Sequence, residues 1–125
     1  CETVAAKSWQ SGVNNGNTLT SDRVRAFLRD AHVQAVRLGM VDMNLLTVAG
    51  EPAAFAYNYH HQGRVFGLRT GFDATSPCRS AGLALILQSL KDSFERGDTQ
   101  IDMGIGEWRF KRHLRTSTET SQRLR

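Results

Sequence analysis

The sequence predicts one domain of the α/β (α+β) class, with a mixed, mainly antiparallel sheet that contains an antiparallel meander and has flanking helices. Two segments, 22–38 and 83–94, carry apolar residues at the period of an amphipathic helix. Between them, residues 43–70 change to the two-residue period of strands, interrupted by short turn signals. Because short connections join antiparallel neighbours, these strands form a meander, and a further strand follows the second helix.

Length and composition are those of a single globular domain. A chain of 125 residues can bury roughly two-thirds of its unfolded surface, and 40% hydrophobic with 22% charged residues are typical of soluble proteins. No apolar run approaches the ~20 residues that a membrane span needs. Cys1 and Cys78 lack metal-ligand spacing, so we expect free thiols, no metal and a cytoplasmic location. The start has neither an initiator methionine nor a signal-peptide pattern, which indicates a piece of a longer protein.

Basic charge is concentrated near the end of the chain. The net charge is +4, and six of the sixteen Lys and Arg residues fall between Arg109 and Arg125. Such a cluster can bind phosphate on nucleic acid, on a membrane surface or on a cofactor, or it can form a solvated tail. No recognition-helix or aromatic-stacking pattern accompanies the charge, which disfavours nucleic-acid binding.

Residues 1–19 are expected to form an N-terminal loop, because Ser, Asn and Gly are frequent there and favour local turns; Trp9 would anchor it. The first helix follows. Its apolar residues recur with helical spacing at Val24, Phe27, Leu28, Ala31, Ala35 and Leu38. Thr20 or Ser21 can cap the start of this helix, and Gly39 can end it.

Three strands are expected over 43–49, 53–60 and 64–70, with turns at 50–52 and 61–63. Phe55, Tyr57 and Tyr59 alternate along the middle strand and therefore share one face, where core packing explains the tyrosines as well as catalysis does. His60 and His61 lie at the second turn. We interpret both as solvated turn histidines.

The second helix is strongly amphipathic in sequence. One stripe consists of Leu83, Ile86, Leu87, Leu90 and Phe94. The opposite face carries Gln88, Asp92, Glu95 and Arg96. Gly97 supplies the stop, and a short strand, 100–103, then leaves the sheet at Gly104 and Gly106.

The loop before the second helix favours a phosphate. A helix N-terminus offers free backbone N–H groups and the positive end of a dipole, and small residues let an anion approach them. Here Gly82 and Ala84 are small, and Arg79 adds a cation. The alternative is a plain helix start, with Ser76 as the cap, Pro77 in the first turn and Gly82 incidental.

Several motifs occur in an order that resembles the GNAT N-acyltransferases. They are Trp9, Gly50-Glu51-Pro52-Ala53-Ala54, Asp73 with Ser76-Pro77, the R-x-x-G-x-A stretch from Arg79 to Ala84, Asp102-Met103-Gly104-Ile105-Gly106, and Phe110-Lys111. The resemblance is closer to the acetyltransferases grouped with the cellulose-biosynthesis CelD proteins and related to the FemAB aminoacyl ligases. It divides the chain into the loop 1–19, a GNAT-like acyl-CoA-binding domain over 20–115, and a flexible basic tail over 116–125.

The resemblance implies that the chain binds acetyl-CoA or another acyl-CoA and transfers the acyl group directly to an amine or hydroxyl. The acceptor it implies is a small molecule or a cell-envelope or polysaccharide precursor. It places the CoA pyrophosphate at Arg79, Ser80, Ala81, Gly82, Leu83 and Ala84. It also makes Leu68 and Thr70 neighbours of the cofactor, along the strand 64–70.

The chain departs from this branch in two respects. Cys78 stands where a glycine usually follows Ser-Pro, and members of the branch are about twice as long, so the chain resembles their second half. A half would expose a sheet edge, and we therefore expect a homodimer formed by edge pairing or by swapping an element. The alternative functions are a non-catalytic half used for dimerisation or binding, and a FemAB-like aminoacyl transfer.

Asp102 and Lys111 are the candidate catalytic residues. Asp102 ends the last strand, where a carboxylate can meet the substrate, although a turn aspartate before Gly104 explains it equally well. Glu107 is a weaker candidate. The resemblance makes Lys111 a candidate for binding an anionic acceptor or polarising a carbonyl, against a solvated lysine in a basic tail. Cys78 has no histidine nearby in sequence, so we do not expect covalent catalysis.

Overall fold

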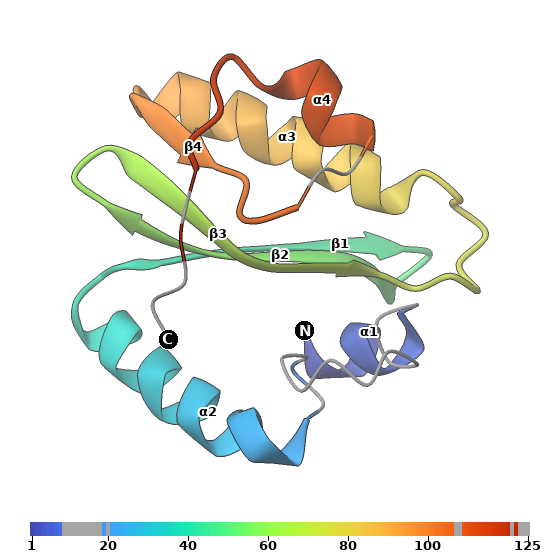
Figure 1. Cartoon of the computed structure of the whole chain (residues 1–125). Helices are drawn as coiled ribbons and strands as arrows, with labels where there is room; N and C mark the ends of the chain where they lie inside the picture. The colour runs from blue at the N-terminus through green and yellow to red at the C-terminus, as the bar shows by residue number, and fades with distance from the viewer. Residues whose placement is uncertain (9–18, 20, 107–108, 121, 123–125) are drawn as a thin grey trace.

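The computed structural model describes residues 1–8, 19, 21–106, 109–120 and 122. Its elements are α1 (Glu2–Lys7), α2 (Asp22–Arg37), β1 (Val41–Val48), β2 (Glu51–His61), β3 (Arg64–Phe72), α3 (Ala81–Arg96), β4 (Gln100–Asp102) and α4 (Arg109–Leu114). The sheet lies between a layer formed by α1 and α2 and a layer formed by α3 and α4 (Figure 1). The predicted α+β class is confirmed.

The sheet has the order β1-β2-β3-β4, in which the first three strands form the antiparallel meander and β4 runs parallel to β3. Ala49 and Gly50 connect β1 to β2, and Gln62 and Gly63 connect β2 to β3. All four have positive φ, between 49° and 85°, as in the two-residue turns that match the twist of a hairpin. The turns expected at 50–52 and 61–63 are therefore shorter than predicted, and β2 is correspondingly longer.

The two faces of β2 carry side chains of different size. Phe55 and Tyr57 pack with Val4 and Ala5 of α1 on one face, where Phe55 is 1% exposed. On the other face Ala53, Ala54 and Ala56 pack with Ala81 and Leu85 of α3. The small alanine side chains of β2 and Ala81 of α3 let the helix approach the sheet closely. The alternation predicted for β2 is confirmed.

The loop predicted over 1–19 is wrong for residues 2–7, which form α1. Val4 is 1% and Ala5 is 4% exposed, so this short helix is held by burial against the sheet. Six residues are too few to show a helical period in sequence or to form a stable helix alone. Trp9 lies outside the described residues.

Both long helices are confirmed, but their buried faces differ from the predicted stripes. On α3 the sheet side carries Ala81, Leu85 and Ser93, while Leu83, Leu87 and Phe94 are 45%, 48% and 84% exposed. On α2 the predicted stripe is likewise divided, because Ala35 is 6% but Phe27 and Leu38 are 70% and 72% exposed. The contact with the alanines of the sheet holds Leu85 together with the small Ala81 and Ser93, whereas Leu83, Leu87 and Phe94 face outward.

Gly97 ends α3 in the left-handed conformation, with φ 83°, as predicted.

In the described part of the chain, no helix is long and apolar enough to cross a bilayer. Among the same residues, no group of three or more His, Cys, Asp or Glu side chains could hold a metal ion. Residues 116–120 contain no helix or strand.

Candidate functional site

β3 and β4 run side by side over three residue pairs and then separate. The pairs are Arg64 with Gln100, Val65 with Ile101, and Phe66 with Asp102. Gly67 lies at the fork, where a Cβ atom would come 2.8 Å from the carbonyl oxygen of Asp102. Only glycine allows this approach. Beyond the fork β3 continues to Phe72 without β4, so its outer backbone edge can pair with an extended ligand.

A β-bulge lies directly after the fork. Tyr57 pairs with Arg69 and Asn58 pairs with Gly67, so Leu68 is an extra residue in β3. A β-bulge bends its strand and changes the direction of a side chain, and bulges are frequent next to active sites. The Leu68 side chain packs against the core cluster on the α1 side of the sheet. Thr70 pairs with Ala56, whose side chain faces α3, so the two predicted cofactor neighbours belong to opposite faces.

The start of α3 presents backbone N–H groups that can bind a ligand. Ser80 is the N-cap residue, and the N–H of Ala81 donates to the carbonyl of Cys78 at 3.1 Å. In the described part of the chain no acceptor is found for the N–H groups of Ser80, Gly82 and Leu83. Together with the helix dipole, these three donors can bind an anion, and the exposed Arg79 precedes them directly.

The turn between β3 and α3 is held by Asp73, which is 7% exposed. Its carboxylate accepts hydrogen bonds from the N–H of Thr75 at 2.8 Å and from the hydroxyl of Thr75 at 2.6 Å. The Thr75 hydroxyl above all, with Lys7 at 3.4 Å, holds the pKa of Asp73 below its usual value. The Asp…Ser-Pro motif therefore shapes the loop that presents the start of α3.

Gly82 has a packing role that the sequence did not indicate. A Cβ atom at this position would lie 3.1 Å from Cδ1 of Phe72, so the first turn of α3 rests against the end of β3. The interpretation of Gly82 as incidental is therefore wrong. A valine here would press on Phe72 as well as on a bound phosphate, so this substitution cannot separate the two effects.

Asp102 and Lys111 lie together where β4 ends. Asp102 accepts a hydrogen bond from the N–H of Gly104 at 2.7 Å, as expected for a turn aspartate. Lys111 donates to the carbonyls of Gly104 at 3.0 Å and Ile105 at 3.1 Å. Burial lowers the pKa of Lys111, and the Asp102 carboxylate partly opposes this. Lys111 therefore stabilises the segment that follows β4, through its hydrogen bonds to Gly104 and Ile105. It is not a solvated tail residue. Glu107 lies outside the described residues.

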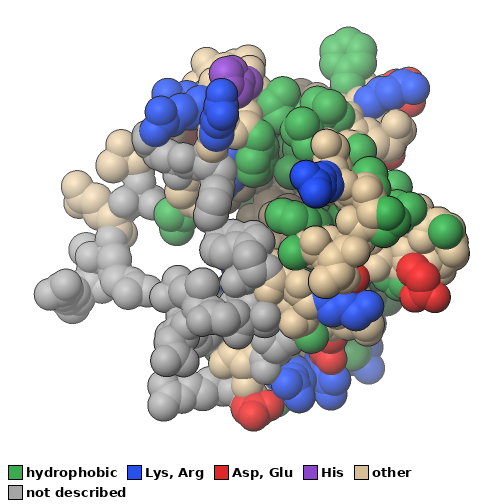
Figure 2. All heavy atoms as spheres, turned by 90° about the vertical axis from the view of Figure 1, so that its right-hand side faces the viewer, with side chains coloured by type: hydrophobic (Ala, Val, Ile, Leu, Met, Phe, Trp, Pro, Cys, Tyr) green, Lys and Arg blue, Asp and Glu red, His purple; other side chains and the backbone are tan. Residues whose placement is uncertain are grey.

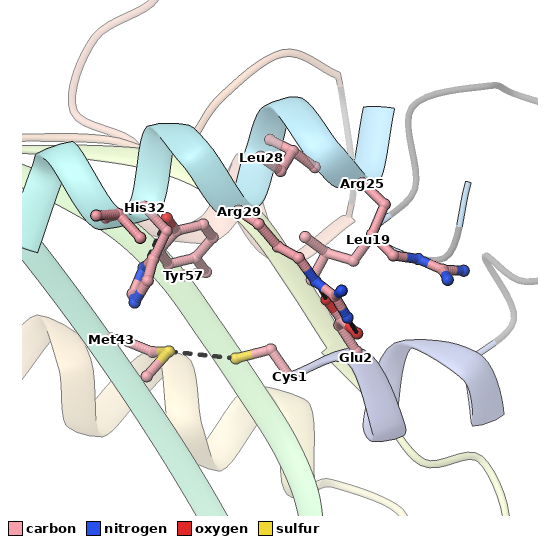
Figure 3. A pocket seen from close by; sticks show the side chains of 10 residues that line it. Cys1, Glu2, Leu19, Arg25, Leu28, Arg29, His32, Met43 and Tyr57 are labelled. Carbon is pink, nitrogen blue, oxygen red and sulfur yellow. Dashed lines mark hydrogen bonds and ion pairs between the residues drawn. The ribbon is translucent and has the colours of Figure 1, made fainter. Parts of the chain in front are cut away.

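A cavity of about 330 Å³ lies on the other side of the sheet, between α1, α2 and the first two strands (Figure 3). Tyr57 and His32 line it, and the Tyr57 hydroxyl is 3.1 Å from Nδ1 of His32 and 3.5 Å from the Tyr59 hydroxyl. Burial above all raises the pKa of Tyr57 far above its usual value, so the phenol stays neutral. The sequence did not indicate this cluster, because His32 is 25 residues from Tyr57.

His60 is wrongly predicted as a solvated histidine, because its Nε2 lies 2.8 Å from Oδ1 of Asp98; His61 is exposed, as predicted. Asp98 also accepts hydrogen bonds from the Ser93 hydroxyl at 2.6 Å and from Arg96 at 2.7 Å. The Arg96 guanidinium above all holds the pKa of Asp98 well below its usual range, despite burial. This network fastens the end of α3 to β2.

Asp98 should make the free energy of unfolding depend on pH. Its folded-state pKa is below that of an unfolded aspartate, about 3.9, so its contribution is present at neutral pH and is lost as the pH falls below that value. Asp98→Asn should therefore lower the free energy of unfolding by about 1–3 kcal/mol at neutral pH, with a smaller deficit in acid. Urea unfolding at several pH values measures both, and a deficit independent of pH would contradict this role.

The free cysteines are partly buried, and Cys78 packs against the core beside α3. No titratable base within the described residues hydrogen-bonds to its thiol.

The forked sheet, with a helix N-terminus facing its open side, defines a class of α/β domain that is suited to an extended ligand with a phosphate group.

Similarity to known proteins identifies the family within this class. The family model of the acetyltransferase (GNAT) domain matches residues 3–112, and the chain belongs to this family. A crystal structure of PaiA N-acetyltransferase from Thermoplasma acidophilum in complex with coenzyme A has a similar fold, with a TM-score of 0.57 and 14% identity over 78% of this chain. The chain spans 65% of that structure's length. No curated protein matches the sequence.

Proposed function

We propose that the chain is an acyl-CoA-binding acyltransferase domain that transfers the acyl group directly to an amine or hydroxyl. The observation that carries this proposal is the fork between β3 and β4, beside three N–H groups at the start of α3 for which the described residues offer no acceptor. The residues from Arg79 to Ala84 would hold the pyrophosphate. The open edge of β3, with Leu68 and Thr70, would hold the pantetheine arm.

Direct transfer requires a polarised thioester carbonyl, a deprotonated acceptor and a proton for the departing thiolate. Backbone N–H groups on the outer edge of β3, beyond the fork, would polarise the carbonyl. Asp102 retains a second carboxylate oxygen that can accept a proton from the acceptor, and it lies at the mouth of the fork. Lys111 would bind an anionic acceptor, or act through the segment that it pins.

A thermal-shift experiment tests the proposal. CoA or acetyl-CoA at 100 times its dissociation constant should add about 2.7 kcal/mol to the free energy of unfolding. For a domain of this size the midpoint should rise by roughly 10 °C. Dephospho-CoA should retain most of the shift and pantetheine should lose it, because the pyrophosphate makes the proposed contact. No shift with either CoA or acetyl-CoA would overturn the proposal for this chain.

A non-catalytic domain that binds CoA or a partner is the second candidate. It is favoured because Asp102 and Lys111 both make hydrogen bonds to backbone groups of the same segment. Release of the CoA thiol in the presence of amine acceptors separates the two candidates. Binding without release, across a range of small amines, would favour the second.

We also propose that the chain belongs to the CelD-related branch, acts in the cytoplasm and modifies a cell-envelope or polysaccharide precursor. The order of motifs supports this branch, and Asp73 and Ser76 of the Asp…Ser-Pro motif both accept hydrogen bonds from backbone N–H groups of the loop. The FemAB-like alternative would use an aminoacyl-tRNA instead of an acyl-CoA, so competition between these two donors distinguishes them. A homodimer, finally, is proposed because large apolar side chains are exposed on both layers.

A further inference from the structure

The cavity between α1, α2 and the first two strands is not used by the proposed acyl-CoA site. It lies on the opposite face of the sheet from the start of α3 (Figure 1). Apolar side chains on the outer side of α3 gather in the upper part of Figure 2, but they form an open surface. The cavity, in contrast, is hollowed, because side chains from two helices and two strands surround one volume of about 330 Å³ (Figure 3).

The walls of the cavity suit an aromatic ring. Leu19 and Leu28 line it on the side of α2. On the side of β1, the sulphur atoms of Cys1 and Met43 lie 3.4 Å apart. A thioether sulphur makes favourable contacts with aromatic rings, and a thiol packs as a small apolar group. A flat apolar ring can therefore contact leucine side chains on one side and sulphur atoms on the other.

The volume of the cavity is that of a small ring system. An apolar cavity of ~150 Å³ is large enough to bind benzene. At about 330 Å³, the cavity of this chain has roughly twice that volume. One aromatic ring or two fused rings therefore fit.

One ring nitrogen of His32 is available to a ligand. Nδ1 of His32 lies 3.1 Å from the hydroxyl of Tyr57, which is itself only 5% exposed, whereas Nε2 has no hydrogen-bond partner among the described residues. The His32 ring points from α2 toward Met43 (Figure 3). In a neutral imidazole one nitrogen donates and the other accepts, so Nε2 takes whichever role Nδ1 does not. A hydroxyl group can donate and accept, and it matches Nε2 in either tautomer.

The charged side chains beside the cavity are already paired. Arg29 donates hydrogen bonds to both carboxylate oxygens of Glu2, at 3.0 and 2.8 Å. The guanidinium of Arg25 lies 3.2 Å from the carboxylate of Asp22. An ionic ligand would have to break one of these pairs or be buried without a partner, which is costly. The cavity therefore favours a neutral ligand.

We propose that this cavity binds a neutral aromatic compound of one or two rings that carries a hydroxyl group. The rings would lie between Leu28 and Met43, and the hydroxyl would form a hydrogen bond with Nε2 of His32. This site goes beyond the proposed acyl-CoA binding and does not depend on it, because the two sites lie on opposite faces of the sheet. The chain would thus have two separate small-molecule sites.

A ligand series tests the chemical class. 2-Naphthol, naphthalene and 2-naphthoate share one ring system and differ only in having a hydroxyl, no polar group or a carboxylate. In NMR titrations of the chain at neutral pH, 2-naphthol should bind with a dissociation constant of about 0.1 mM or lower. Naphthalene should bind about fivefold more weakly, because it lacks the hydrogen bond, and 2-naphthoate at least about tenfold more weakly, because its charge would be buried. No binding of 2-naphthol, or tighter binding of 2-naphthoate, would overturn the proposal.

Met43→Trp tests the location. The larger side chain should fill part of the cavity and raise the dissociation constant for 2-naphthol at least about tenfold. Leu45→Trp is the matched control, because Leu45 lies on the same face of β1 and is 51% exposed, against 52% for Met43, but does not line the cavity. This control should bind 2-naphthol as the wild type does. Tryptophan is favourable in strands, so both variants should fold, which circular dichroism measures. Equal affinities of the two variants would overturn the location.

His32→Leu tests the hydrogen bond. This variant should bind 2-naphthol and naphthalene equally well, with the affinity for naphthalene within about twofold of the wild type. A preference for 2-naphthol that persists in His32→Leu would overturn the role of His32. Saturating CoA should leave the affinity of the wild type for 2-naphthol unchanged, and competition would overturn the separation of the two sites. The CoA thermal shift should be the same in Met43→Trp as in the wild type, so failure of either proposal can be recognised separately.

Discussion

Replacing Arg79 by glutamate should remove CoA binding while the fold remains intact. Arg79 is exposed, and within the described residues no ion pair or hydrogen bond involves its side chain. The substitution takes away a charge-assisted hydrogen bond to phosphate and adds like-charge repulsion beside the N–H groups of Ser80, Gly82 and Leu83. We expect the dissociation constant for CoA to rise about a hundredfold, equivalent to about 2.7 kcal/mol.

Titration calorimetry with CoA measures this effect, and the neutral variant Arg79→Gln is its control. Arg79→Gln should lose about tenfold in affinity, because it removes the cation without adding an anion. Without ligand, Arg79→Glu should not lower the thermal midpoint, since a carboxylate near a helix N-terminus is favourable. Pantetheine lacks the pyrophosphate, so its affinity should be the same for all three proteins. Unchanged CoA affinity in Arg79→Glu would contradict the phosphate site.

The sequence predicted those parts of the fold that depend on local periodicity. The meander follows from alternation along β2, where Phe55 and Tyr57 are buried on one face. The end of α3 follows from Gly97, whose left-handed backbone conformation few other residues adopt without strain. The ends of the strands were predicted less accurately, because the connections are two-residue turns. Ala49 and Gln62 adopt positive φ in these turns, which their residue types do not predict.

The orientation of α3 was not predictable in this way. An apolar stripe shows that a helix has an apolar face, but it does not show which neighbour covers it. Here the sheet carries alanines at 53, 54 and 56, and the contact holds Ala81, Leu85 and Ser93 while Leu83, Leu87 and Phe94 stay outside. The polar Ser93 is buried because its hydroxyl donates to Asp98. That bond depends on the chain reversal after Gly97.

The candidate site also has one part that the sequence predicted and one part that it did not. The loop from Arg79 to Ala84 could be recognised, because glycine, small residues and an arginine precede a helix in sequence. The fork could not, because no sequence pattern states how many residues of β3 pair with β4. It depends on the contact between Gly67 and Asp102, which are 35 positions apart in the sequence. The roles of His60 and Lys111 likewise follow from tertiary contacts.

Gly67→Ala should therefore weaken both the fold and CoA binding. The added methyl group would lie 2.8 Å from the carbonyl oxygen of Asp102 and 3.4 Å from the backbone of Met103, and backbone atoms cannot move aside as a side chain can. We expect the free energy of unfolding to fall by about 1–3 kcal/mol, as in overpacked cores. The strands would separate before the fork, which should lower the affinity for CoA at least about tenfold.

The control must lose stability without moving the fork. Val65 is 4% exposed and pairs with Ile101 in the closed part of the strands, so Val65→Ala should cost about 2 kcal/mol through a cavity. Below its unfolding transition this variant should bind CoA as the wild type does. Because both variants are destabilised to a similar degree, a selective loss of affinity in Gly67→Ala isolates the geometry of the fork. If both variants bound CoA equally well, the ligand would not depend on where β3 and β4 separate, and the proposed site for the pantetheine arm would be wrong.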